Sequence, residues 1–245
     1  MQIYSFDQFE TDTVLFSAYA VLCETGYSGP AAIDAADTDA YIAAAVISQQ
    51  LPGTLCIKRK HETIFCRGLV TDDMADCIVQ LHCMTGCDPN SGFYGKGKKS
   101  LYDQVATSPV ARRQLSRCGD CLDLEEETVE QLFEFTSQII YGDNKNSTMA
   151  EARAAKWKRM KNKSFIRLPP DECSIRQHCL RANYLAYLMR HPSLKHHPSP
   201  LGHGWELVGD RCRPVRHTRP DLPTHLPAPE PVEESGEEDS EKEDE

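Results

Sequence analysis

Acidic residues recur at three places in the amino-terminal part of the chain, each next to a predicted helix. Glu10 and Asp12 begin the first helix, Asp37 and Asp39 follow the next strand, and Asp88 follows the third helix. The carboxyl ends of strands in an open α/β sheet share one edge, so we expect these carboxylates to lie together. They would repel one another unless cations lay between them, which predicts a Mg²⁺ or Mn²⁺ site suited to phosphodiester cleavage. The alternative is that they are helix caps and surface carboxylates.

A glycine-lysine turn follows the last of these aspartates. Its residues are Gly95, Lys96, Gly97, Lys98 and Lys99, and a helix is predicted to follow at Leu101. Glycines leave the backbone amides accessible to a phosphate, and the lysines add positive charge. The turn lacks the Gly-Lys-Ser/Thr ending and the preceding strand of a nucleoside-triphosphate P-loop. It therefore predicts contact with a nucleic-acid backbone.

The elements that must position these residues alternate between helix and strand. The spacing of apolar residues and the turn residues predict helices over 12–24, 41–51 and 71–81, and strands over 30–36, 54–57 and 63–66. Thr71 is expected to cap the third helix, whose apolar face is Met74, Cys77, Ile78 and Leu81. This alternation favours an α/β fold with a parallel sheet flanked by helices.

A helical extension is predicted after the turn. Helices are expected over 105–115, 125–141, 148–161 and 175–189, irregular structure beyond 191, and a disordered acidic tail beyond 220. We divide the chain into a nuclease-type domain over 1–104, a helical extension over 105–165, a carboxy-terminal module over 166–219 and the tail over 220–245.

Composition adds limits on location and partners. The net charge is −10, from 37 acidic and 27 basic residues. Residues 230–245 hold 10 of the acidic residues and one lysine, so the rest of the chain has 27 acidic and 26 basic residues and is nearly neutral. This tail is either solvated or a binding segment for a protein partner. No apolar run is long enough to cross a bilayer, and the start is not a secretory leader. We therefore expect no membrane contact and an intracellular, nuclear rather than cytoplasmic, location, with the 11 cysteines reduced.

The ordered acidic pairs and the Gly-x-Gly-Lys turn resemble the flap-endonuclease group of PIN-like nucleases. A more extensive resemblance is to uncharacterised transposon-associated animal proteins with the patterns EADT, VDTDV, TGCDTxSxFxGKGKK, HxxRANYxA and PSPxGHGW. The corresponding stretches here are FETDT, ADTDAY, TGCDPNSGFYGKGKK, HCLRANYLAYL and PSPLGHGW, between Phe9 and Trp205.

This resemblance implies a PIN-like α/β domain in which a metal-dependent nuclease acts on nucleic acid, DNA rather than RNA. Asp37, Asp39 and Asp88 would be catalytic metal ligands, and Glu10 and Asp12 would complete the metal site. PIN-like nucleases begin with a strand that carries another aspartate, and only nine residues precede Glu10 here. We therefore expect a partial domain, and the sequence leaves open whether it is an active nuclease or a non-catalytic scaffold that binds nucleic acid or protein.

Other motifs are weaker. Cys118 and Cys121 form a lone CxxC pair, and the histidines and cysteines after residue 172 fit no standard zinc spacing, so zinc is not expected. The run from Arg153 to Lys163 is basic and contains Trp157, which suits either a phosphate-facing surface or a solvated helix face. The RANY stretch is interpreted as helix packing rather than as catalytic.

Overall fold

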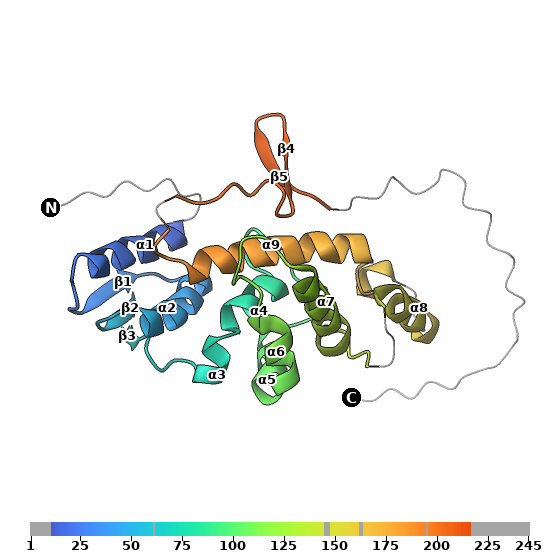
Figure 1. The fold of residues 1–245 in the computed structure, drawn as a ribbon. Helices are drawn as coiled ribbons and strands as arrows, with labels where there is room; N and C mark the ends of the chain where they lie inside the picture. Colours follow the sequence, from blue (N-terminus) through green and yellow to red (C-terminus); the bar gives the residue numbers. More distant parts are fainter. Residues whose placement is uncertain (1–10, 61, 145–147, 162–163, 195, 217–245) are drawn as a thin grey trace, which may run out of the picture.

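The computed structural model describes residues 11–60, 62–144, 148–161, 164–194 and 196–216. A small three-stranded sheet lies at one end of the molecule (Figure 1). The strands are β1 (Ala31–Asp34), β2 (Leu55–Arg59) and β3 (Glu62–Phe65), in the order β1-β2-β3. β1 pairs with β2 in parallel, as predicted, and β2 pairs with β3 antiparallel. The antiparallel pair follows from the short β2–β3 connection, since parallel neighbours need a long crossover.

Two helices cover this sheet. They are α1 (Thr11–Glu24) and α2 (Thr38–Gln50), close to the predicted bounds. Phe16 and Tyr19 of α1 and several alanines of α2 are buried with Ile33, Leu55 and Ile57 of the strands. The small alanine side chains let α2 pack closely on the sheet, and this packing positions the start of α2 relative to the end of β1.

The third predicted helix is two helices, which corrects the sequence prediction. α3 (Asp72–Ala75) and α4 (Ile78–Thr85) are separated at Asp76 and Cys77, and the Thr71 side chain makes no capping hydrogen bond. The predicted apolar face is nevertheless buried. The pattern of apolar residues thus identified the buried side, while the break depends on how the two short helices pack.

The helical extension begins earlier than predicted and divides at a proline. α5 (Lys98–Thr107) and α6 (Pro109–Ser116) replace the single helix predicted over 105–115. Ser108 caps α6 by accepting from the Ala111 amide at 3.2 Å, and Pro109 occupies the first turn, where its missing N–H costs nothing. α7 (Glu126–Phe135) continues into the π-helical segment η1 (Thr136–Ile140). α8 (Met149–Arg159) and the 3₁₀ turn η2 (Phe165–Arg167) follow.

The longest helix, α9 (Glu172–Arg190), runs across the other helices (Figure 1). Asp171 caps it by accepting from the Cys173 and Ser174 amides at 3.0 and 3.1 Å. Arg181 of the RANY stretch donates to Asn90 Oδ1, and the Tyr184 hydroxyl donates to the Pro198 carbonyl at 2.8 Å. These side chains fasten loops to α9, in agreement with the packing role predicted for the stretch.

A hairpin after α9 is the element that the sequence prediction missed. β4 (Trp205–Val208) and β5 (Arg211–Pro214) pair antiparallel, in a region predicted to be irregular. The β5 residues are all exposed, so the strand carries no apolar alternation that could have indicated it. Arg181 Nη1 donates to the carbonyls of Gly204 and Val215 on either side of the hairpin, at 3.3 and 2.7 Å.

The larger hydrophobic core joins residues from all three predicted segments before the tail. It includes Val46 of α2, Leu81 of α4, Leu132 of α7 and Ile175 of α9, with Trp205 packed against it. The predicted disordered tail over 220–245 lies outside the described residues.

Candidate functional site

Asp37 and Asp39 lie where β1 ends and α2 begins, at the predicted edge. Asp37 is the N-cap of α2, and its Oδ1 accepts a hydrogen bond from the Asp39 amide at 3.1 Å. This is the usual local role of an aspartate before a helix, so Asp37 has a structural function whatever else it does. Asp39 lies in the first turn with a side chain that is 13% exposed, directed at His82 of α4.

His82 links Asp39 to the glycine-lysine turn. Its Nε2 lies 2.9 Å from Asp39 Oδ1, and its Nδ1 lies 3.4 Å from Lys98 Nζ. The lysine ammonium can only donate, so Nδ1 is the acceptor and the proton of a neutral ring is on Nε2, facing Asp39. The Nε2–Asp39 contact is close but poorly aligned, since Nε2 has no hydrogen-bond partner of regular geometry. It is therefore a close polar contact of a carboxylate with an imidazole ring.

The environment of Asp39 favours its ionised form. Interaction with the His82 ring is the largest influence and lowers the pKa of Asp39, while burial acts in the opposite direction. The positive charge of Lys98 and a hydrogen bond from the Asp88 backbone amide lower this pKa further. Asp39 is therefore a carboxylate at neutral pH whose charge is already compensated by protein groups.

Asp88 lies at the tip of a tight loop after α4, with an exposed side chain. Cys87 and Asn90 exchange backbone hydrogen bonds across the loop at 2.9 and 3.0 Å, and the Asn90 side chain donates to the Cys83 carbonyl. Gly86 has φ 113°, and a Cβ there would lie 2.8 Å from the Gly92 backbone, so glycine is required at this close approach. The loop therefore holds the Asp88 backbone beside Asp39 and directs the side chain outward.

The predicted site residues are thus only partly brought together. Asp37 and Asp39 lie together after β1, and the Asp88 backbone lies near Asp39, but the described residues contain no group of three acidic, histidine or cysteine side chains placed to hold a metal ion. Asp37 caps a helix and His82 already contacts Asp39, so the three aspartates alone do not fit a Mg²⁺ or Mn²⁺ site. Glu10 lies outside the described residues, as does the side chain of Asp12.

The glycine-lysine turn leads directly into α5. Gly97 is the N-cap and makes no side-chain capping hydrogen bond, so first-turn amides are open to an anion. Lys99 is exposed and pairs with Asp103 at 2.9 Å, a contact that solvent screens strongly. Lys96 lies 5.4 Å from the centre of the Tyr141 ring. The lysines of the turn therefore point in different directions, with Lys98 toward His82 and Lys96 toward Tyr141.

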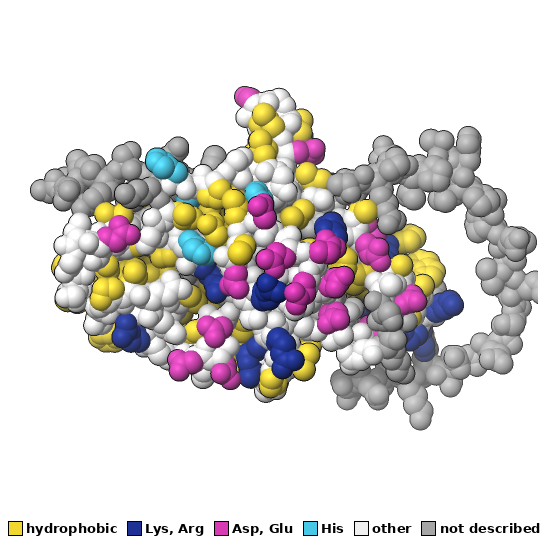
Figure 2. Space-filling view, viewed as in Figure 1, with side chains coloured by type: hydrophobic (Ala, Val, Ile, Leu, Met, Phe, Trp, Pro, Cys, Tyr) yellow, Lys and Arg dark blue, Asp and Glu magenta, His cyan; other side chains and the backbone are white. Residues whose placement is uncertain are grey.

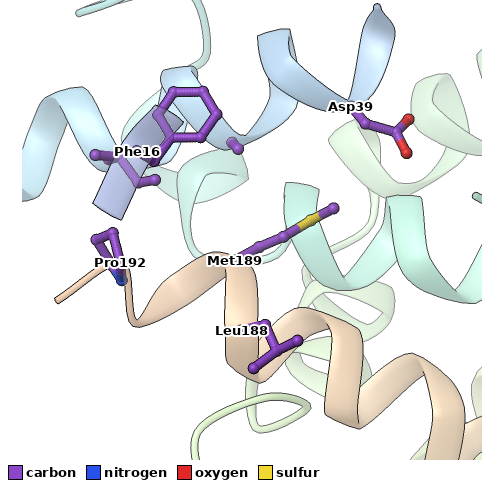
Figure 3. Close-up of a pocket in the computed structure, with 7 residues that line it drawn as sticks. Phe16, Asp39, Leu188, Met189 and Pro192 are labelled. Atoms are coloured by element: carbon purple, nitrogen blue, oxygen red, sulfur yellow. The ribbon is translucent and has the colours of Figure 1, made fainter. Parts of the chain in front are cut away.

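The hollow beside Asp39 is too small for a substrate. Figure 3 shows Asp39 with Phe16, Leu188, Met189 and Pro192 around a cavity of about 10 Å³, room for about one water molecule.

The cysteine motifs show no metal centre among the described residues. Cys118 is buried and burial raises its pKa to about 12, whereas Cys121 is exposed. Cys179 is buried too, and its neighbour His178 contacts the Met84 carbonyl through Nε2. Interaction with Cys83 is the largest influence on Cys87 and lowers its pKa, while burial acts in the opposite direction.

His82 is the residue that sequence reasoning missed. It lies on the helix before the Asp88 loop, among apolar residues, and is 4% exposed. In the sequence it therefore looks like an ordinary core residue. A polar histidine within an apolar helical segment is the one sequence feature that could have indicated a buried polar contact. Nothing in the neighbouring sequence indicated that Asp39 is the residue it contacts.

Comparison of the chain with protein-family models, curated proteins and solved structures gives no match. Among the described residues, no helix has both the length and the apolar character needed to cross a bilayer. Acidic and basic side chains are intermixed over the helical part in Figure 2, so that face is not a uniformly basic surface.

Proposed function

We propose that this chain binds the phosphate backbone of DNA and is a scaffold of the flap-endonuclease-related, PIN-like type, of transposon origin. One observation carries the proposal: the glycine-lysine turn and the acidic edge are connected through Lys98, His82 and Asp39. A phosphate bound at the turn would lie next to the edge that holds Asp37 and Asp39, with the Asp88 backbone near Asp39. The sequence motifs that resemble the transposon-associated proteins support the same assignment.

The binding would combine backbone amides with side-chain charge. The first-turn amides of α5 carry the positive end of the helix dipole, and two lysines lie in the same turn, Lys98 beside His82 and Lys99 paired with Asp103. Neutralising phosphates with lysine releases counterions, so binding should weaken steeply as salt increases.

Fluorescence polarisation with a labelled DNA duplex tests this function. Lys98→Gln and Lys99→Gln should each weaken binding and reduce the slope of log K against log salt by about 1 for each phosphate that is no longer neutralised. Lys58→Gln is the matched control, because Lys58 is an exposed lysine on β2. Binding that is absent, or equally sensitive to all three substitutions, would refute backbone contact at the turn.

Phosphodiester hydrolysis is a second candidate, favoured by one specific observation. The Asp88 backbone amide lies near the Asp39 carboxylate and lowers its pKa, so two of the predicted catalytic residues are neighbours. In a nuclease, Mg²⁺ or Mn²⁺ would supply an activated water and charge stabilisation. The described residues do not form that ligand set, so hydrolysis would need further ligands besides these aspartates.

The nuclease candidate is tested with flap, nicked and single-stranded substrates in the presence of Mn²⁺. A nuclease of this type should lose cleavage in Asp37→Ala and Asp88→Ala and retain it in Asp34→Ala, an exposed carboxylate at the end of β1. Calorimetric titration with Mn²⁺ gives an independent readout. No cleavage, or cleavage unaffected by the first two substitutions, would leave backbone binding as the function.

A further inference from the structure

A second, larger cleft lies on the other side of the Asp88 loop. Its volume is about 580 Å³, within the range of small-molecule and cofactor sites. Several parts of the chain form it: the loop before the glycine-lysine turn, the residue after η1, the α8 helix, the η2 turn, the α9 helix and the end of the β4–β5 hairpin. The residues that line it are Pro89, Ser91, Gly92, Phe93, Tyr94, Tyr141, Arg153, Phe165, Ile166, Leu168, Pro170, Ser174, His178, Arg181, Pro214 and Arg216.

Aromatic rings provide much of the cleft surface. Phe93 packs edge-on against Tyr141, with ring centres 6.0 Å apart, and lies 4.9 Å from the His178 ring. Tyr94 and Phe165 lie at the opening and are 56% and 74% exposed. Exposed aromatic side chains at a cleft indicate a surface that another flat, apolar group can cover.

His178 adds a buried polar group to this surface. Its Nε2 lies 2.8 Å from the Met84 carbonyl, which can only accept, so Nε2 carries the proton and Nδ1 is an acceptor. Burial lowers the pKa of His178 to about 4, so the ring is neutral at physiological pH. A neutral ring with an acceptor nitrogen suits a hydrogen bond to a base edge, without adding charge.

The cleft is also cationic. Arg153, Arg181 and Arg216 line it, and none of the described lining residues is Asp or Glu. The hydrogen bonds of Arg181 go to neutral acceptors, the Asn90 side chain and two carbonyls, so they leave its charge uncompensated. Arg153 also lines the neighbouring hollow beyond Phe165, together with Asp171 and Glu172, so acidic side chains lie beside one of the three arginines.

Two lysines converge on the Tyr141 side of the cleft. Lys96 Nζ and Lys156 Nζ lie 5.4 and 5.7 Å from the centre of the same ring. Burial, and repulsion from Lys156, lower the pKa of Lys96. Lys156 lines the adjoining hollow together with the buried carboxylate of Asp143, so part of this positive charge already has an acidic neighbour.

We propose that this cleft binds an unpaired nucleotide of single-stranded DNA, with its base against the aromatic rings and its phosphate near Arg181 and Arg216, which line the cleft. The proposal rests on the proposed function and adds the substrate class. A base in a duplex is stacked and paired, whereas an unpaired base can stack on aromatic side chains next to a cationic groove. Lys96 belongs to the glycine-lysine turn, so one strand could contact both places.

The test measures the binding of a labelled oligothymidine and of a duplex of equal length to the full chain. Tyr94→Ser and Phe165→Ser should each weaken single-strand binding by roughly 5- to 150-fold and leave duplex binding unchanged. Phe65→Ser is the matched control, since Phe65 is 64% exposed on β3, away from the cleft. All three changes are at exposed side chains, so the fold should persist in each variant.

The outcomes separate this inference from the proposed function. Single-strand binding unaffected by Tyr94→Ser and Phe165→Ser, while Lys99→Gln still weakens duplex binding, would overturn the cleft assignment alone. Loss of all DNA binding in the unsubstituted chain would overturn both. A competition experiment uses an acidic peptide with the same charge as the oligothymidine. If this peptide displaces labelled oligothymidine as effectively as unlabelled oligothymidine does, the inference is also overturned, because the attraction is then by charge without base recognition.

Discussion

Replacement of Asn183 by alanine should destabilise the fold more than any surface substitution. Asn183 lies on α9 and is 2% exposed. Its Oδ1 accepts from the Gly119 amide at 2.7 Å, and its Nδ2 donates to the carbonyls of Cys121 and Leu122 at 3.0 and 2.9 Å. This amide side chain therefore holds the loop between α6 and α7 against α9, together with Arg190, which donates to the Cys118 carbonyl and pairs with Asp120.

The expected loss follows from these three hydrogen bonds. The two hydrogen bonds to carbonyls contribute about 1 kcal/mol each, and the loss of the partner of the buried Gly119 amide costs about 1–3 kcal/mol. The substitution should lower the free energy of unfolding by about 3–5 kcal/mol. For a protein of this size that corresponds to a fall in Tm of roughly 6–20 °C.

Urea unfolding followed by circular dichroism measures this change, with Gln104→Ala as the control. Gln104 is an exposed amide side chain on α5 with one long hydrogen bond of 3.5 Å to Ser100, so its loss should cost little. A loss below about 1 kcal/mol for Asn183→Ala would refute the reasoning, because it would mean that water or loop movement replaces all three bonds. An equal loss in both variants would refute it too.

Two further predictions concern packing and pH. Gly204→Ala should lower the free energy of unfolding by about 1–3 kcal/mol by disturbing the attachment of the hairpin. The φ of Gly204 is 88°, and a Cβ there would lie 2.6 Å from Arg181 Cγ and 2.7 Å from the Gln177 carbonyl. An unchanged urea midpoint would contradict this prediction. The lowered pKa of Asp39 means that its stabilising contact with His82 is present above its ordinary pKa of 3.8 and is lost as pH falls below that value. Asp39→Asn should therefore reduce the acid dependence of urea midpoints, and an identical dependence in both proteins would count against the contact.

Much of the fold could be predicted because its signals are local. The α1, α2 and α9 helices, and the three strands of the sheet, follow from apolar spacing and turn residues within each segment. Helix breaks were less predictable, since the division between α3 and α4 carries neither glycine nor proline. The β4–β5 hairpin was missed because its exposed strands follow no alternation and are held from outside, by Arg181.

For the candidate site, the sequence by itself placed Asp37 and Asp39 at the start of a helix and Asp88 in the loop after another. Capping and turn formation depend on neighbours in the chain, so the sequence is sufficient for them. Only the tertiary structure decided that Lys98 faces His82, that His82 faces Asp39, and that the Asp88 side chain points outward. The contact between His82 and Asp39 joins residues far apart in the chain, and it exists because α2 and α4 pack together and bring the Asp39 carboxylate to the His82 ring.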